Sequence, residues 1–213
     1  KSEIIVHRAH RNPYDWSLRL LNCRMTEIGF PNMILPTTED DLEYAVTDNT
    51  AAVFYFFMPP GGWVAKGALS LEATIRVASR HGIPVIVDAA AQVPPAENLW
   101  RITGLGADAC IFSGGKDLRG PQASGLMVGT KDFFSWVEKT AFPTYGVGRM
   151  FKVGREEIVG LLAAVEQYVS MDGEARVQWA EGRIAAARKA FGGSNVVSVE
   201  RLFPNEAGQP FPQ

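Results

Sequence analysis

Two ionisable residues in this sequence stand where two predicted strands end. Asp88 follows the apolar residues 84–87, and Lys116 lies 28 positions later, just past the apolar residues 109–112. Because the carboxyl ends of parallel strands meet at one rim of a sheet, we expect both side chains at that rim. A carboxylate there can keep an aromatic nitrogen protonated, while a lysine amine can hold an aldehyde as an imine. On their own, the two residues also fit a structural strand end and a solvated loop.

The predicted elements around this pair alternate between buried strands and amphipathic helices. Residues 51–57 are almost all β-branched, aromatic or small apolar, which is typical of a strand covered on both faces. Ser70 can cap a helix that ends at Gly82, a residue suited to a left-handed C-cap. This alternation predicts an α/β fold with a largely parallel sheet. The expected strands are 3–6, 24–28, 51–57, 84–87, 109–112, 126–128 and 195–203, and the expected helices are 14–22, 38–46, 71–82, 97–102, 155–169 and 174–191.

The sequence pattern changes in its last third. From Arg155 onward an apolar stripe with helical spacing replaces the alternation of strands and helices. We interpret residues 144–154 as the joint between two domains. The predicted division is a large domain over residues 1–147 and, over residues 148–213, a linker helix with an incomplete small α/β domain.

The composition is that of an ordinary globular protein, with 46% hydrophobic and 21% charged residues. A net charge of −2 disfavours nucleic acid and anionic membranes as the main partners. The most apolar run, residues 50–60, is too short to span a bilayer, and the first residues lack the apolar stretch of a secretory signal. Cys23 and Cys110 lie far apart without metal-ligand spacing, so we expect no metal site and a reducing cytoplasm.

Two longer segments around the pair resemble a known family. They are Pro84-Val-Ile-Val-Asp-Ala-Ala-Ala-Gln92 and Phe112-Ser-Gly-Gly-Lys-Asp-Leu-Arg-Gly-Pro-Gln-Ala-Ser-Gly125. Both resemble the core of fold-type-I enzymes that use pyridoxal 5'-phosphate (PLP) and have the aspartate-aminotransferase fold. The resemblance is to the bacterial selenocysteine synthase (L-seryl-tRNA selenium transferase) group and its relatives, which include sugar-acid ammonia lyases. It extends from residues 7–15 through 148–157 to Tyr168, and it is most specific over residues 113–125.

The resemblance implies a role for each residue that matches the cofactor site. Lys116 would form the Schiff base with PLP and later move the Cα proton. Asp88 would pair with the pyridine nitrogen, and the methyl group of Ala90 would pack against the ring. The hydroxyl of Ser113 would bind the phosphate, helped by backbone N–H groups of residues 114–115.

Other polar residues are candidates for substrate binding. Arg119 and Gln122 could reach a phosphate or a carboxylate, across a subunit boundary in an oligomer, although either can equally be a solvated loop residue. His10, which follows the first strand after His7, could present a cation to an acidic or phosphorylated substrate. Its alternative is a structural histidine at a strand end. We also assign Gln92 and Arg149 to substrate binding. For Arg149, a solvated surface charge is the alternative.

The chain departs from the family pattern in two respects. Residues 58–62 read Met-Pro-Pro-Gly-Gly, whereas aminotransferases have there an asparagine that contacts the ring hydroxyl, so ordinary transamination is disfavoured. Family members also have a segment before the first strand that carries a glycine-rich phosphate loop, and a fuller C-terminal domain. We therefore expect that the chain is part of a longer protein and that alone it binds the cofactor poorly.

These observations favour a PLP-dependent lyase or transferase that acts at Cα and Cβ of an amino acid or amino sugar acid. The substrate would be a small molecule, although tRNA stays possible because the resemblance includes a tRNA-dependent group. The resemblance also implies a homo-oligomer. The rival hypothesis is a non-catalytic or incomplete domain that keeps the fold for assembly or regulation. A Rossmann-like nucleotide binder is disfavoured, because no predicted strand leads into a Gly-x-Gly-x-x-Gly turn.

Overall fold

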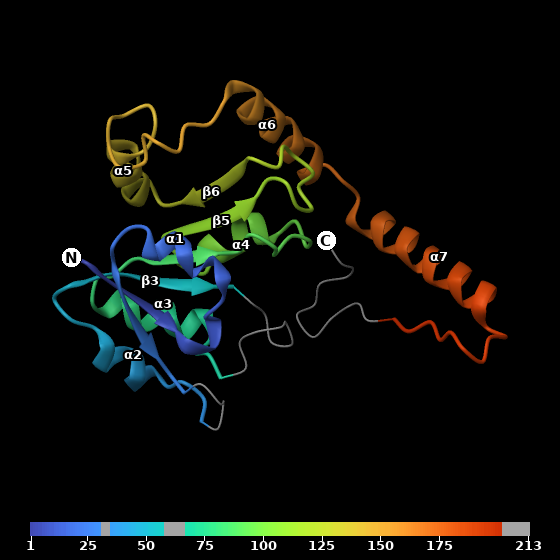
Figure 1. Ribbon diagram of the computed structural model, residues 1–213, viewed down its shortest axis with the longest axis horizontal. Coiled ribbons are helices and arrows are strands. Elements are labelled where there is room, and N and C mark those ends of the chain that lie inside the picture. Colours follow the sequence, from blue (N-terminus) through green and yellow to red (C-terminus); the bar gives the residue numbers. More distant parts are fainter. Residues whose placement is uncertain (31–34, 58–66, 202–213) are drawn as a thin grey trace.

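The chain folds around a six-stranded sheet with the strand order β2-β1-β3-β4-β5-β6 (Figure 1). The computed structural model describes residues 1–30, 35–57 and 67–201. Every neighbouring pair of strands is parallel except β5 and β6, which are antiparallel. The expected α/β fold with a mostly parallel sheet is therefore confirmed. The strands are β1 (Glu3–His7), β2 (Arg24–Ile28), β3 (Thr50–Phe56), β4 (Val85–Asp88), β5 (Ala109–Ser113) and β6 (Gly125–Gly129).

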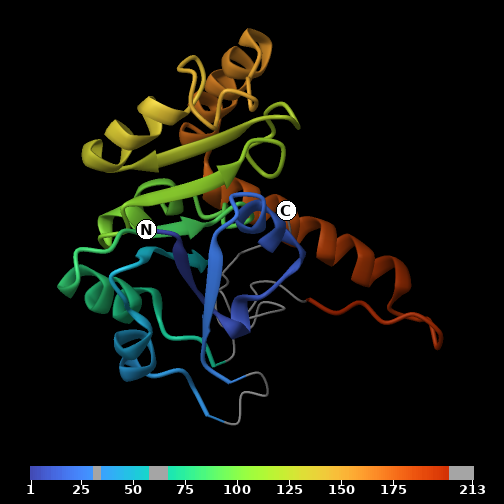
Figure 2. The same cartoon turned by 60° about the vertical axis from the view of Figure 1, so that its left-hand side comes forward.

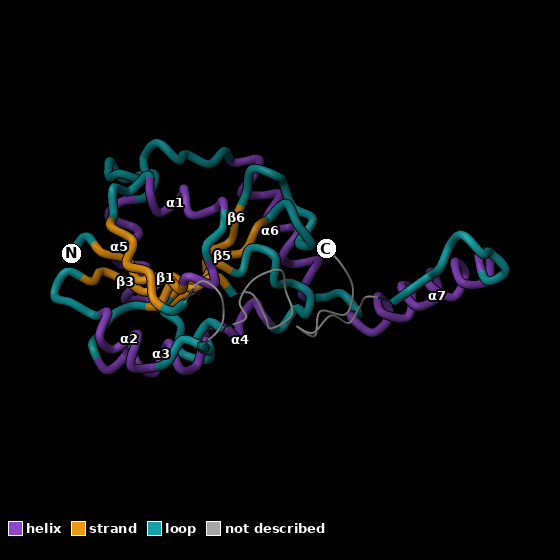
Figure 3. The backbone as a smooth tube through the Cα atoms, turned by 60° about the horizontal axis from the view of Figure 1, so that its bottom comes forward, coloured by secondary structure: helices purple, strands orange, loops and turns teal. Residues whose placement is uncertain are grey.

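Helices cover both faces of this sheet, with α2 and α3 on one side and α1 on the other (Figure 3). The predicted cap at Ser70 is present, because its hydroxyl accepts a hydrogen bond from the Ala73 N–H. At the start of α2, where either Thr37 or Thr38 suited a cap, Thr38 forms a capping box with Asp41. Gly82 has the left-handed φ of +60° that its position after a helix requires. The α-helices are α1 (Trp16–Arg19), α2 (Glu39–Ala45), α3 (Leu71–Arg80), α4 (Asn98–Gly104), α5 (Lys131–Thr140), α6 (Arg155–Val169) and α7 (Gly173–Phe191), and 3-10 helices cover Arg8–His10 and Pro13–Asp15.

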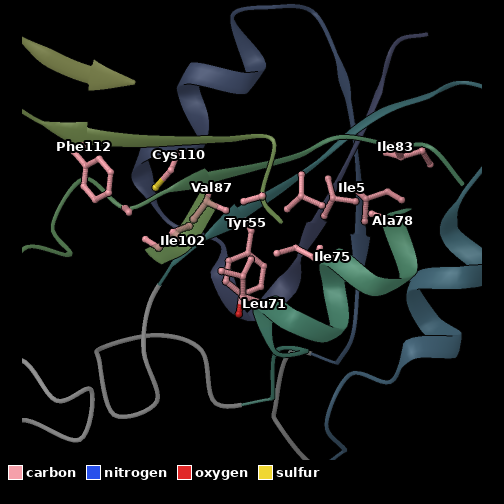
Figure 4. Packing of buried hydrophobic residues seen from close by; sticks show 14 of the residues in the cluster. Ile5, Tyr55, Leu71, Ile75, Ala78, Ile83, Val87, Ile102, Cys110 and Phe112 are labelled. Carbon is pink, nitrogen blue, oxygen red and sulfur yellow. The ribbon is translucent and has the colours of Figure 1, made fainter. Parts of the chain in front are cut away.

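The two sheet faces bury separate apolar clusters. The larger one joins alternate residues of the strands, such as Val53, Val87 and Phe112, to α3 and α4 (Figure 4). The smaller one contains Phe54 and Phe56 on the opposite face. Because side chains alternate along a strand, this division fixes which strand residues point to which face.

The last two helices leave the body of the sheet. α6 lies beside β6, and α7 projects away from the rest of the chain (Figures 1 and 2). α7 contains no buried residue, whereas Tyr168 near the end of α6 is buried in the larger cluster. The predicted domain boundary between residues 147 and 148 stays a prediction.

Three sequence predictions differ from the structure. The helix expected over 14–22 is only Trp16–Arg19, preceded by a 3-10 turn, and no strand forms over residues 195–201, the described part of 195–203. Helix α5 was not predicted. Its apolar residues, such as Phe133 and Trp136, remain partly or largely exposed in the structure, and Thr130 caps it, a signal from which the sequence could have predicted the helix.

Candidate active site

Asp88 and the Lys116 loop lie at the same rim of the sheet. Asp88 is the last residue of β4 and pairs in register with Ile111 of β5, while Lys116 follows the end of β5 by three residues. Since side chains alternate, Asp88, Ile111 and Ser113 point to one face of the sheet. The parallel arrangement of β4 and β5 thus brings a carboxylate, a hydroxyl and the amine-bearing loop together.

The Asp88 carboxyl is partly buried and interacts electrostatically with Lys116. Burial raises the pKa of Asp88, whereas a hydrogen bond from the Ala90 N–H and the charge of Lys116 lower it. The Ala90 nitrogen lies 2.9 Å from Asp88 Oδ1. Within the described part of the chain, Asp88 and Lys116 form no ion pair. The carboxylate therefore interacts with the nearby amine, and its second oxygen has no hydrogen-bond donor among the described residues.

Lys116 stands on a tight turn closed by backbone hydrogen bonds. The N–H of Gly120 donates to the Gly114 carbonyl at 2.8 Å, and the N–H of Arg119 donates to the Lys116 carbonyl at 2.8 Å. Arg119 adopts a left-handed φ of 60°, which is uncommon for a residue other than glycine. The Lys116 side chain itself is exposed. The turn therefore fixes the backbone at Lys116 and presents the amine to solvent.

The two glycines before Lys116 are needed for packing within the loop. A Cβ on Gly114 would overlap the Ser124 hydroxyl, and one on Gly115 would come within 2.6 Å of Gln122. The Gln122 side-chain amide donates to the Gly115 carbonyl at 2.9 Å. The N–H of Gly114 donates to the Ser124 carbonyl at 3.0 Å, so it is not available to a phosphate. The Ser113 hydroxyl and the Gly115 N–H make no hydrogen bond within the described residues, so both are open to such a ligand.

His10 lies in a different place from Asp88. Its ring packs edge-on against Tyr55 with the centroids 4.5 Å apart, and His7 lies 4.8 Å from it. Tyr55 precedes Phe56, the register partner of Asp88, so Tyr55 and Asp88 point to opposite faces, and Figure 4 shows Tyr55 in the cluster with Val87. Both histidines are fully buried, and none of their ring nitrogens has a hydrogen-bond partner in residues 1–30, 35–57 and 67–201. In this structure they belong to the core.

Because His7 and His10 are buried, we expect the free energy of unfolding to decrease at acid pH. Burial lowers the pKa of His7 to about 4, and burial with repulsion from His7 lowers that of His10 to about 3. The unfolded chain, with pKa values near 6.5, takes up protons first, so the contribution is complete above pH 6.5 and is lost as pH falls below it. The free energy of unfolding should decrease by about 1.4 kcal/mol per pH unit for each histidine. Urea unfolding at pH 7, 6 and 5 measures this slope.

A matched pair of variants checks the source of that slope. His10→Leu removes one buried imidazole that makes no hydrogen bond, so the pH slope should become shallower. His81→Leu, which replaces an exposed histidine beside Glu43, should not flatten the slope in the same way. An unchanged slope in His10→Leu would show that the buried pair does not cause the acid sensitivity.

Two other predicted substrate residues, Gln92 and Arg149, have different surroundings. The Oε1 atom of Gln92 is buried without a hydrogen-bond partner in the described residues. The guanidinium of Arg149 lies 4.8 Å from the ring centre of Phe142 and 5.5 Å from that of Tyr145. Phe142 also lines an apolar groove of about 610 Å³ between β6 and α6, whereas Arg149 is not among the residues that line it. The departure predicted at residues 58–62 lies outside the described residues.

Sequence reasoning gave no role to Asp117, the residue after Lys116. Its carboxylate is buried, accepts a hydrogen bond from the Tyr168 hydroxyl at 2.6 Å and forms a bidentate ion pair with Arg176. A carboxylate between a lysine and the apolar Leu118 was a possible signal. The partners could not be found in the sequence, because they lie 51 and 59 residues away.

Two general features of the described residues concern membranes and metals. None of the helices there combines the length and the apolar character needed to cross a bilayer. No group of three or more histidine, cysteine, aspartate or glutamate side chains is placed there to hold a metal ion.

Several known proteins are similar to this chain in sequence, although no family model matches it. The chain is 34% identical to D-glucosaminate-6-phosphate ammonia lyase of Salmonella typhimurium over 78% of its own length. It is 33% identical over 82% to 5'-C-glycyluridine monooxygenase-decarboxylase of a Streptomyces species, and 27% identical over 71% to L-seryl-tRNA(Sec) selenium transferase of Serratia proteamaculans. The matches cover 43%, 42% and 33% of those relatives, so the chain spans less than half of their length.

The same relationship appears in three dimensions. A solved structure of D-glucosaminate-6-phosphate ammonia-lyase superposes with a TM-score of 0.68 at 32% identity. The superposition covers 80% of this chain and 44% of that one. The similarity in sequence and in structure therefore extends over most of the chain, including both β4 and the Lys116 loop.

Proposed function

Because the chain belongs to the fold-type-I family of PLP-dependent enzymes related to selenocysteine synthase, we propose that it carries the cofactor-binding core of a PLP-dependent lyase or transferase. The reaction would take place at Cα and Cβ of an amino acid or amino sugar acid. The observation that carries this proposal is the position of Asp88 at the end of β4 and of Lys116 three residues after the end of β5, at one rim of the sheet. The relatives support it, since they include an ammonia lyase and a selenium transferase.

The chemistry of the donor set fits PLP. Asp88 offers a carboxylate oxygen that no described protein group occupies, for the protonated pyridine nitrogen. Lys116 offers an exposed primary amine for the aldehyde, and Ser113 offers a free hydroxyl for the phosphate. Ala90, whose N–H donates to Asp88, would present only a methyl group to the ring. When bound, PLP supplies a ring that stores the electron pair released at Cα.

Asp88 and Lys116 would then have different roles in the reaction. Asp88, ionised by contact with a cationic ring nitrogen, would keep that nitrogen protonated, although burial alone raises its pKa. Lys116 would hold the cofactor covalently and, once released by the substrate amine, would move a proton at Cα. The turn around Lys116 keeps the amine at the rim while its exposure allows the exchange. Gln92, Arg119, Gln122, Arg149 and His10 are retained as proposed substrate contacts, with the least support for the core residue His10.

The substrate is proposed to be a small acid rather than tRNA. The ammonia lyase is more similar to this chain than the tRNA-dependent transferase is, at 34% against 27% identity. The net charge of −2 also offers no extended basic surface for a polyanion. The cytoplasm as the location and a homo-oligomer as the assembly are proposed from the family resemblance alone.

The reaction class can be tested directly in the full-length protein. We expect release of ammonia, or of another β-substituent, from phosphorylated amino sugar acids when PLP is present, measured with a coupled ammonia assay. Tight and salt-sensitive binding of seryl-tRNA would overturn the preference for a small substrate. Failure to develop an absorption band near the visible edge on addition of PLP would instead favour the non-catalytic alternative.

A further inference from the structure

Asp117, the residue next to Lys116, makes more side-chain contacts than Lys116 itself. Asp117 is 6% exposed, and its two oxygens receive three hydrogen bonds: one from the Tyr168 hydroxyl at 2.6 Å and two from the Arg176 guanidinium at 3.0 and 2.9 Å. Bidentate pairs between arginine and a carboxylate are among the strong, geometrically specific contacts of proteins. We call these three residues the Asp117 cluster.

The Asp117 cluster joins three separate parts of the chain. Asp117 belongs to the turn after β5, Tyr168 to the last turn of α6, and Arg176 to the first turns of α7. Tyr168 is buried in the larger apolar cluster, and the guanidinium of Arg176 lies 5.7 Å from the centre of its ring. Because α7 has no buried residue, this contact near its beginning is a principal attachment of that helix to the sheet.

Tyr168 and Arg176 of the cluster both keep their protons at neutral pH. Burial and the hydrogen bond to Asp117 raise the pKa of the Tyr168 phenol, which therefore stays protonated as a donor. The hydrogen bonds to Asp117 raise the pKa of Arg176 further above its usual value. The ion pair is only slightly exposed, and removing one partner would leave a charge buried without compensation.

Lys116 has no comparable restraint of its own. Its side chain is exposed and has no hydrogen-bond partner among the described residues, so its direction depends on the backbone of the turn. That backbone is held on the following side by Asp117 and by Leu118, which is 2% exposed. The next residue, Arg119, is in the left-handed conformation, which the surrounding contacts must maintain.

We propose that the Asp117 cluster is a positioning network that fixes the Lys116 turn against α6 and α7. Its role in catalysis rests on the proposed function, since it matters only if Lys116 carries the cofactor. Asp117, Tyr168 and Arg176 touch neither cofactor nor substrate in this account. They hold the amine of Lys116 where Asp88 can face the same ring.

Hydrogen exchange tests the positioning without any cofactor. In cofactor-free full-length protein, Arg176→Ala and Asp117→Asn should accelerate amide exchange in residues 114–120 by about tenfold or more, because a buried ion pair is lost. Arg176→Lys, which keeps one charged contact, should restore part of the protection. Arg188→Ala, at an exposed position on the same helix, is the matched control and should leave the turn unchanged. Equal exchange in all variants overturns the proposal.

A second readout uses the cofactor. With PLP bound, the pH midpoint of its visible absorption band should shift in Asp117→Asn and Arg176→Ala and return toward the original value in Arg176→Lys. A purely structural role would change stability without moving this midpoint. If the unsubstituted protein shows no band, the proposed function fails, while the exchange experiment still decides whether the cluster orders the turn. If the band is present and its midpoint is the same in every variant, positioning of Lys116 is refuted.

Discussion

Lys116→Ala should abolish covalent binding of PLP and lower the rate of substrate turnover at least about a thousandfold, because both the imine and the proton transfer at Cα lose their amine. Folding should be almost unaffected. The side chain is exposed and unpaired in the described residues, and substitutions at such positions usually change the free energy of unfolding by no more than about 0.5 kcal/mol. Turnover assays and urea unfolding of the same preparation measure the two effects.

Lys131→Ala is the matched control for this substitution. Lys131 is also exposed, but it begins α5 and lies away from the rim where β4 and β5 end. Its replacement should leave both cofactor binding and turnover intact. Residual turnover in Lys116→Ala close to that of the control would mean that another group holds the aldehyde.

Asp88→Asn should lower turnover by about a hundredfold to several thousandfold, the loss expected from roughly 3–5 kcal/mol for a buried charged pair. The amide keeps an oxygen that can accept from the Ala90 N–H, so the local backbone contact can persist. In the absence of cofactor, Asp88→Asn should not lower the free energy of unfolding, and at neutral pH it should raise it. Since burial raises the pKa of Asp88, the ionised carboxylate is unfavourable in the folded chain, and its stability cost grows as pH rises through that pKa.

The two parts of this prediction separate function from folding. Cofactor-free Asp88→Asn should be at least as stable as the original protein at neutral pH, while turnover is strongly reduced. Asp132→Asn, on the exposed face of α5, is the control and should change neither quantity much. A variant that loses stability and activity in parallel would assign Asp88 a structural role.

The sequence was most informative where local patterns coincide with burial. The strand over 24–28 has the bounds that the structure gives, and β3 differs from its expected range by one residue at each end. β3 consists of residues that suit a buried pleated strand, whereas in β2 only Ile28 is buried. The caps at Thr38 and Ser70 act over three residues. Short-range preferences of this kind need no knowledge of the fold.

Contacts between distant parts of the chain could not be predicted from local sequence patterns. His10 was a candidate because a cation after the first strand could bind an acidic substrate, but its contact with Tyr55 depends on which face of β3 it meets. The contacts of Asp117 depend on where α6 and α7 return to the sheet. The proximity of Asp88 and Lys116 was an exception, since the rule for parallel strand ends is enough to predict it.

The most direct test of the account is to reduce the full-length protein with borohydride in the presence of PLP and to map the modified peptide by mass spectrometry. The account predicts one pyridoxyl group, on Lys116 in the peptide that follows β5, and its loss in Lys116→Ala. A pyridoxyl group on another lysine, or none at all in protein that binds PLP, would contradict the assignment.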